Sequence, residues 1–420
     1  MTFLIIICIF LLMSKKISTL FDTSKIPLDA VKIIEDFDKL VQEIRPLNSR
    51  QLQQLPQNIR SLSHQMTDNR AERRLGYMNE NAQLSSYVRY FTWWNLVRLT
   101  RLFSNLTESA FPKGDSVCLD LGSGPLTVVT ALFLARPELR KLKLTWYCLD
   151  VSAASMAFGE DIFLSVCAKL NEQPWQIIRV KGSFGEALKQ KASFITCANM
   201  FNELDQATDM PPEFKVKKYY EQLMRYSNKD ARFLLIEPGV PKASRTLTLL
   251  RERFIKDGYD IAAPCPHSGE CPMSGFKAYT GSKNKWCNFA FSTQEEGAGI
   301  PERLAKLSKA AKLPKDRATL SFIFAVPVCP FRPLRQAQGP QGPKEDIRIT
   351  SDELRLPNYM SGFYACTEHG LALVELPSQN NTRLPKPPFR PQSGDLIEVK
   401  KITPESLPKD EKSGSIIIKL

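Results

Sequence analysis

One stretch constrains the fold of this chain more than any other: an apolar run that ends in an acidic residue and two glycines. It reads Val117-Cys-Leu-Asp120-Leu-Gly122-Ser-Gly124-Pro125, and the apolar segment Leu126-Thr-Val-Val-Thr-Ala-Leu follows it. This order is typical of the strand, tight loop and helix that open a doubly wound α/β domain. The glycines permit positive φ and a close approach of a ligand to the backbone, while a helix beginning near Pro125 would offer N–H groups to an electronegative ligand. The stretch therefore predicts a nucleotide-type binding site.

The glycine spacing indicates which nucleotide-type ligand to expect. The dinucleotide pattern Gly-x-Gly-x-x-Gly is incomplete, because Thr127 stands where the third glycine belongs. The shorter Asp-x-Gly-x-Gly resembles motif I of methyltransferases that depend on S-adenosylmethionine, although such a turn can also be a turn and nothing more. The first candidate cofactor residues are Asp120, Gly122, Ser123, Gly124 and Pro125.

Two later apolar runs extend the same site. Leu144 to Leu149 predicts a second strand that ends in Asp150, where a carboxylate can accept hydrogen bonds from ribose hydroxyls. The alternative is that Asp150 caps the next helix, a role that Ser152 could also take. Phe194 to Asn199 predicts the fourth strand.

The carboxyl end of that fourth strand should face the ligand crevice. Asn199, Asn202 and Glu203 are therefore candidates for the substrate side, with Asn199 also a cofactor candidate. The chain lacks the Asn/Asp-Pro-Pro-aromatic signature of many enzymes that methylate amino nitrogens. Cys197 lies within the apolar run, where a small core residue is a better interpretation than a nucleophile.

Residues 14–105 are predicted to form a helical accessory domain, because apolar residues recur at helical spacing from Asp29 onward. Within it, Tyr87 to Arg98 mixes aromatic side chains with arginines. Such a segment can stack on nucleic acid, but at helical spacing a core role is favoured.

Composition and charge limit the class of protein. The chain has 420 residues, 43% apolar and 24% charged, and a net charge of +13, which favours a polyanionic partner such as RNA. Phe3 to Met13 is apolar but too short to span a bilayer, and we interpret residues 1–13 as an over-extended start rather than a signal or anchor. Ten cysteines without a convincing export signal indicate a reducing compartment. We expect a monomer without stable membrane association.

Three cysteines amid prolines predict a metal site. Cys265 and Cys271 lie in one compact turn, and Cys287 begins an apolar strand. Thiolates grouped in this way bind zinc or an iron–sulfur cluster, although unligated thiols are the alternative. From the residues alone the fourth ligand stays open among His267, Cys329 and Cys366.

The remaining pattern divides the chain further. Residues 106–330 are predicted to be a Rossmann domain with an inserted cysteine loop at 261–290, closed by an antiparallel edge hairpin that includes Phe322 to Pro327. The Pro-, Gly- and Gln-rich residues 331–346 predict a linker. Residues 347–420 predict a small β module, with a hairpin turning at Glu368 to Gly370.

Taken together, the motifs resemble a known family: the methyltransferase-like proteins associated with the mitochondrial small ribosomal subunit, and their bacterial relatives. The resemblance covers roughly Tyr77 to the carboxyl terminus. It is carried by Asp120-Leu-Gly-Ser-Gly-Pro, Asn202-Glu-Leu, Ile236-Glu-Pro-Gly, Ala263-Pro-Cys265-Pro-His-x-x-x-Cys271-Pro, Trp286-Cys287-x-Phe and Cys366-Thr-x-x-Gly.

The resemblance implies a Rossmann-type methyltransferase core, with S-adenosylmethionine and a four-cysteine [4Fe–4S] cluster, acting on or binding small-subunit ribosomal RNA. It selects Cys366 as the fourth thiol beside Cys265, Cys271 and Cys287, with zinc as the alternative metal. The long spacer from Phe276 to Lys285 departs from the family pattern. The expected compartment is the cytoplasm of a bacterium or the mitochondrial matrix of a eukaryote. Two alternative functions remain: a non-catalytic assembly factor and a zinc-stabilised small-molecule methyltransferase.

Overall fold

The computed structural model describes residues 15–67, 77–204, 210–275, 285–295, 297–328, 344–380 and 389–420. Its chain separates into two compact units, one made of residues 21–236 and 292–318 and the other of residues 1–20, 237–291 and 319–420. Within the described ranges, no helix is both long and apolar enough to cross a membrane. The predicted start segment 1–13, Cys329 and most of the predicted linker lie outside the described residues.

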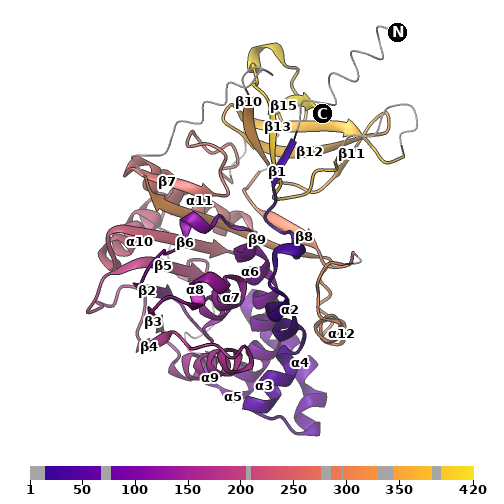
Figure 1. Cartoon of the computed structure of the whole chain (residues 1–420). Coiled ribbons are helices and arrows are strands. Elements are labelled where there is room, and N and C mark those ends of the chain that lie inside the picture. Colours follow the sequence, from indigo (N-terminus) through magenta and orange to yellow (C-terminus); the bar gives the residue numbers. More distant parts are fainter. Residues whose placement is uncertain are drawn as a thin grey trace. The chain divides into compact units, whose positions relative to one another are not determined.

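Five parallel strands of a larger, eight-stranded sheet form the centre of the first unit (Figure 1). Their order is β4-β3-β2-β5-β6, so the first of these strands along the chain, β2, lies in the middle. β3 and β4 are added on one side of β2, and β5 and β6 on the other, which makes β2 and β5 the point where the strand order switches. The strands are β2 (Ser116–Leu121), β3 (Leu144–Asp150), β4 (Gln176–Lys181), β5 (Ala192–Ala198) and β6 (Ser227–Glu237). This is the Rossmann topology that the sequence predicts, and it places the crevice at the carboxyl ends of β2 and β5.

Helices follow the strands of this sheet. They are α7 (Thr127–Ala135), α8 (Pro137–Arg140), α9 (Ala153–Lys169) and α10 (Pro212–Tyr226). α7 is buried along its whole length, whereas α10 buries only the face that carries Val216, Tyr220 and Leu223. The contrast follows the sequence, because α7 is apolar on all sides and α10 is amphipathic.

The amino-terminal part of the first unit is helical, as its spacing predicts. Its elements are η1 (Thr23–Lys25), α2 (Leu28–Glu35), α3 (Phe37–Ile44), α4 (Ser49–Thr67), η3 (Tyr77–Asn79), α5 (Asn81–Ser86), the π-helical turn η4 (Tyr87–Thr92), α6 (Trp93–Asn105) and η5 (Glu108–Ala110), together with the later α12 (Glu302–Ala310). Trp93 is 1% exposed and donates its indole N–H to the Ile34 carbonyl at 2.7 Å. Tyr90 and Trp94 are also buried, so the core interpretation of these aromatic residues is confirmed.

Lys15–Ser18 is a strand, β1, where we expected helix. It pairs antiparallel with β14 (Leu396–Lys400) in the second unit. Four residues are too few to hold a helix by local propensity, so pairing with a distant strand decides their conformation.

The second unit contains a mostly antiparallel β module, in which β13 and β15 pair in parallel (Figure 1). Its strands are β1, β10 (Lys344–Ile349), β11 (Leu354–Leu356), β12 (Met360–Thr367), β13 (Gly370–Pro377), β14 and β15 (Ile416–Lys419). A single helical turn, η6 (Pro404–Ser406), lies between β14 and β15. The predicted hairpin is confirmed, because Thr367 pairs with Gly370 across its turn. Alternate residues such as Ile347 and Ile349, or Ala372 and Val374, fill one core.

The second unit also holds the elements that surround the predicted metal site. They are α11 (Pro241–Lys256), β7 (Tyr259–Ala263), β8 (Phe289–Ser292) and β9 (Arg317–Pro327). β7 pairs antiparallel with β9, and β8 also pairs with β9 but lies outside the main strand order of the sheet. β7 is a strand that the sequence reasoning did not predict.

Candidate functional site

The glycine turn after β2 has the backbone that its residues predict. Gly122 and Gly124 have φ of 65° and 48°, and Leu126, the residue before α7, has a φ of 53°. A non-glycine residue with positive φ is strained, and here the strained residue is fully buried between the turn and the helix. The helix therefore begins two residues later than expected, at Thr127.

The N–H groups of this turn are bound within the chain. Gly122 and Ser123 donate to the Leu149 carbonyl at 2.9 and 3.2 Å, and Gly124 donates to Asp150 Oδ2 at 2.9 Å. The turn therefore uses these N–H groups to hold the end of β3. What the glycines still provide is a surface without Cβ atoms.

Asp150 is the residue that this arrangement positions. Its second carboxylate oxygen, Oδ1, accepts the Ser152 N–H at 2.8 Å, and the residue is 8% exposed. Burial raises the pKa of the carboxyl group, while the two N–H donors act in the opposite direction. Ser152, rather than Asp150, caps α9 by accepting the Ser155 N–H. The two N–H donors fix both carboxylate oxygens, and each oxygen retains a second lone pair.

Asp120 lies behind the cavity wall and is 1% exposed. Thr196 donates its hydroxyl to Asp120 Oδ1 at 2.6 Å, and Ser123 donates its hydroxyl to the Asp120 carbonyl at 2.7 Å. Asp120 Oδ2 has no hydrogen-bond partner among the described residues. Burial raises the pKa of this carboxyl group to about 7. Asp120 thus supports the turn through its hydrogen bonds and does not line the cavity.

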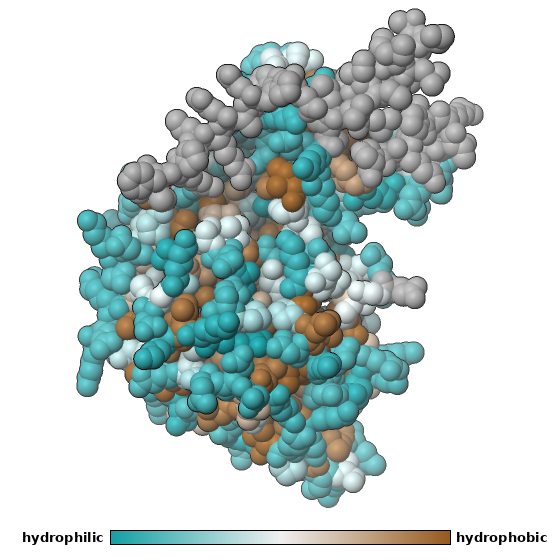
Figure 2. Space-filling view, viewed as in Figure 1, coloured by the Kyte–Doolittle hydropathy of each residue, from teal (hydrophilic) through white to brown (hydrophobic). Residues whose placement is uncertain are grey.

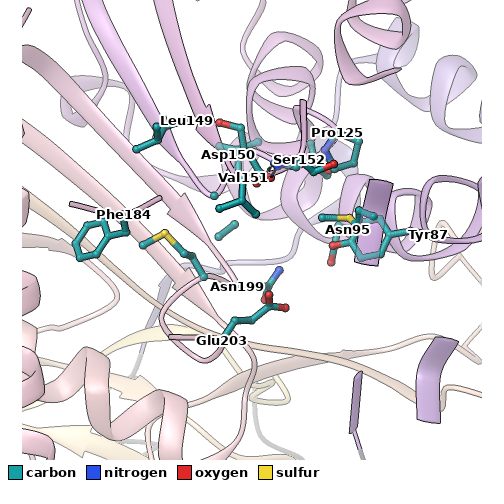
Figure 3. A pocket seen from close by; sticks show the side chains of 18 of the residues that line it. Tyr87, Asn95, Pro125, Leu149, Asp150, Val151, Ser152, Phe184, Asn199 and Glu203 are labelled. Carbon is teal, nitrogen blue, oxygen red and sulfur yellow. Dashed lines mark hydrogen bonds between the residues drawn. The ribbon is translucent and has the colours of Figure 1, made fainter. Parts of the chain in front are cut away.

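A cavity opens at the carboxyl ends of β2, β3 and β5 (Figure 3). All predicted cofactor residues except Asp120 line it: Gly122, Ser123, Gly124, Pro125, Asp150 and Asn199. In Figure 3, Asp150 and Ser152 lie on one side of the cavity, Tyr87 and Asn95 on another, and Asn199 and Glu203 face them.

Asn199 follows the end of β5 with a φ of 58°, which is uncommon for residues other than glycine but less so for asparagine than for most. Its N–H donates to the Ile236 carbonyl, and its own carbonyl accepts the Asn202 side-chain N–H at 3.3 Å. Glu203 lines the cavity as predicted, whereas Asn202 does not and supports the turn. Cys197 is fully buried in β5, so the interpretation of this residue as core is confirmed.

Sequence reasoning missed two parts of the cavity wall. Met78, Tyr87, Asn95 and Leu99 come from the helical segment, and Gly182, Ser183 and Phe184 come from the loop after β4. The structure shows a π-helical turn at Tyr87–Thr92, beside this part of the cavity wall. Nothing in the residue pattern distinguishes that turn from a regular helix, so the sequence carries no signal for it.

The thiols of the predicted metal site lie in the second unit. Cys265 and Cys271 follow β7, Cys287 precedes β8, and Cys366 is in β12. Burial raises the pKa of the Cys271, Cys287 and Cys366 thiols, and the charges of the neighbouring cysteines raise it further. All four cysteines are linked in this way, because Cys265, Cys271 and Cys366 each raise the pKa of Cys287.

Cationic and polar groups surround these thiols. Arg251 Nε donates to Cys265 Sγ at 3.1 Å, and His267 Nε2 lies 3.1 Å from Cys366 Sγ. Ser244 and Ser321 both donate their hydroxyls to the Cys287 carbonyl at 2.7 Å. These four cysteines form no disulfide with one another, and within the described ranges no three His, Cys, Asp or Glu side chains are arranged to hold a single metal ion. The structure therefore gathers the predicted thiols without showing a metal site.

Comparison with known proteins gives the family. The family model described as mitochondrial small ribosomal subunit Rsm22 matches residues 101–323, which is more than half of the chain. The chain belongs to the Rsm22 family. The Rsm22 match contains most of the residues that line the cavity and three of the four cysteines, whereas Met78, Tyr87, Asn95 and Leu99 precede it and Cys366 lies beyond it. Among curated proteins, none matches the chain significantly.

Solved structures of methyltransferases are similar to parts of this Rsm22-family chain. Magnesium protoporphyrin IX methyltransferase from Synechocystis PCC 6803 is 11% identical with a TM-score of 0.32, covering 65% of this chain and 100% of its own. A methyltransferase from Geobacter sulfurreducens is 13% identical with a TM-score of 0.31, covering 56% and 90%. Ribosomal protein L11 methylase from Lactobacillus delbrueckii subsp. bulgaricus is 16% identical with a TM-score of 0.27, covering 42% and 72%.

Proposed function

We propose that this protein binds S-adenosylmethionine in the cavity beside β2 and β3 and acts on RNA of the small ribosomal subunit. The observation that carries the proposal is the pair of hydrogen bonds that fix Asp150 at the cavity wall, one from the glycine turn and one from Ser152. A carboxylate held at the end of the second strand of this topology suits a ribose diol. The family description and the net charge of +13 support a ribosomal RNA partner.

The residues of the cavity fit this cofactor by their chemistry. The Cβ-free turn at Gly122 and Gly124 admits a ligand close to the backbone, and Asp150 offers lone pairs to hydroxyl donors. Apolar walls from Met78, Leu99 and Leu149 suit an adenine ring.

S-adenosylmethionine would supply an activated methyl group, so the protein needs mainly to bind and orient donor and acceptor. Asn199 and Glu203 face the cavity opposite Asp150 and would orient the acceptor (Figure 3). Tyr87 and Asn95 enclose the cavity and would limit access of water.

We further propose that Cys265, Cys271, Cys287 and Cys366 hold an iron–sulfur cluster. A four-iron cluster binds one thiolate at each of four separate irons, and this set offers four thiols. The four cysteines lie in one unit of the chain and influence one another electrostatically, which supports a shared centre. Zinc held by the same sulfur atoms is the alternative.

A second candidate function is an assembly factor that uses the cavity without transferring a methyl group. The observation that favours it is Met200, which stands in the position of the first proline of the amino-methylating signature. Its side chain packs against the glycine turn, 3.0 Å from where a Cβ on Gly122 would lie. We expect either protein to work as a monomer wherever its small subunit assembles, the mitochondrial matrix in a eukaryote or the cytoplasm in a bacterium.

One experiment separates these functions: crosslinking of the protein to RNA in cells, combined with a methylation map of small-subunit RNA in a deletion strain. Loss of a methylated position together with crosslinks near it supports the enzyme. Crosslinks to the same RNA with an unchanged map support the assembly factor. Absence of crosslinked ribosomal RNA contradicts both.

A further inference from the structure

Arg251 is the most unusual residue around the four thiols. It lies in α11 and is 2% exposed, so its charge is withdrawn from water. Burying an unpaired guanidinium ion is costly, and buried charges in proteins are almost always paired. The chain must therefore supply an anion at this point of the fold.

The groups around Arg251 show what that anion is. Its Nε donates to Cys265 Sγ at 3.1 Å, and its Nη2 donates to the His267 carbonyl at 2.9 Å. The anionic partner that these two bonds identify is the thiolate sulfur of Cys265.

A second buried guanidinium group reinforces the same pattern. Arg348 is 6% exposed, and it donates to the Pro264 and Gly394 carbonyls at 2.9 and 2.8 Å. Burial lowers the pKa of its guanidinium group, while the charges of Cys265, Asp395 and Cys366 act in the opposite direction. Arg251 differs from Arg348 in donating one of its hydrogen bonds directly to a sulfur atom.

We propose that Arg251 is a positioning residue for the iron–sulfur cluster: its Nε–H bond to Cys265 stabilises the thiolate and raises the reduction potential of the cluster. This inference rests on the proposed cluster. Hydrogen bonds to the ligating sulfur atoms and positive charge near a cluster both stabilise its more negatively charged, reduced state. The Nη2 bond to the His267 carbonyl also fixes the turn that carries Cys265, which orients this ligand.

The test uses the full chain purified without oxygen, as wild type, Arg251→Gln and Lys256→Gln. Lys256 lies in the same helix and is exposed, so its substitution removes the same charge away from the thiols. Iron and acid-labile sulfide are measured per chain, release of iron to a ferrous chelator is followed over time, and the midpoint potential is determined by a titration monitored by electron paramagnetic resonance.

We expect Arg251→Gln to shift the midpoint potential to more negative values and to weaken iron retention by roughly 10–100-fold, the range for partners of metal ligands. Lys256→Gln should match the wild type in both. An Arg251→Gln protein with the potential and iron release of Lys256→Gln overturns the inference. If Arg251→Gln does not fold, Arg251→Lys carries the test, because lysine keeps the charge but not the planar, directed donor. It should shift the potential in the same direction by less, and an unchanged potential contradicts the inference.

Failure of the cluster proposal looks different. A wild-type chain that binds zinc or no metal overturns the cluster and this inference together. An iron-loaded wild type with an unresponsive potential in the variants overturns the role of Arg251 alone.

Discussion

Gly159 gives the sharpest test of how the cofactor turn is held. It lies in α9, and a Cβ built on it would come 2.3 Å from the Pro125 carbonyl carbon and 2.7 Å from the Leu126 nitrogen. Both are backbone atoms of the turn that lines the cavity, so no flexible side chain can move aside. The substitution Gly159→Ala must therefore displace either the helix or the turn.

The magnitude follows from two opposing effects. Alanine in a helix interior is favoured over glycine by about 1 kcal/mol. Against this, ordinary contact begins near 3.4 Å, so the turn must retreat by about 1 Å from its present 2.3 Å. Overpacking of this kind costs about 1–3 kcal/mol. We expect Gly159→Ala to destabilise the chain by up to about 2 kcal/mol, and to weaken cofactor binding by more than tenfold because the displaced turn also fixes Asp150.

Denaturant unfolding and calorimetric titration with S-adenosylhomocysteine measure the two quantities separately. Gly114→Ala is the control, because a Cβ there meets nothing within 4 Å. If Gly159→Ala is instead more stable by about 1 kcal/mol and binds the ligand as the wild type does, helix propensity alone is at work. That result would refute the packing of α9 against the turn.

Three further predictions concern charged and metal-binding groups. Burial raises the pKa of Asp120 from 3.8 to about 7, so the folded protein favours the protonated carboxyl group. The stability of the ligand-free protein should therefore fall by roughly 4 kcal/mol as the pH rises through this range. Asp120→Asn should flatten that dependence in denaturant titrations at pH 4 to 8, and an unchanged slope contradicts the assignment. Asp150→Asn should weaken binding of S-adenosylhomocysteine at least tenfold, since the amide loses charge and mismatches one of the two N–H donors; a calorimetric affinity equal to that of the wild type contradicts the ribose role. Cys366→Ser should lose most iron under anaerobic purification, while Cys118→Ser, a buried core thiol in β2, should retain it; retention of the full iron content by Cys366→Ser would exclude Cys366 as the fourth ligand.

The Rossmann core could be predicted from sequence because its signals are local. A buried strand, a turn with Gly122 and Gly124 and a following apolar helix occupy about twenty consecutive residues. Alternation and helical spacing likewise predict the hairpin at Thr367 and Gly370 and the helices after Asp29.

What escaped prediction depends on contacts between residues far apart in the chain. The role of Gly159 is visible only once α9 lies on the turn, and the strand Lys15–Ser18 exists only because β14 offers an edge. The hydrogen bond from Gly124 to Asp150 joins the turn after β2 to the end of β3, across 26 positions of the chain. Arg251 was overlooked because only the fold brings its side chain to Cys265, which lies 14 positions further along the chain.

The coloured residues on the face shown in Figure 2 give no simple signal for the partner. In Figure 2 the visible face is mostly hydrophilic, with apolar side chains scattered among polar ones rather than joined in one patch over the coloured residues. Scattered apolar residues are ordinary on a protein surface and indicate no particular partner. The RNA proposal therefore depends on charge and family, and the crosslinking experiment is its proper test.

The central claim is that Asp150 and the glycine turn form a site for S-adenosylmethionine. Its most direct measurement is a calorimetric titration of the full chain with S-adenosylhomocysteine, with Asp150→Ala measured alongside. The account predicts one ligand per wild-type chain and loss of measurable binding in the variant. A wild-type chain that releases no heat and shows no thermal stabilisation at millimolar ligand, or a variant that binds equally well, would contradict it.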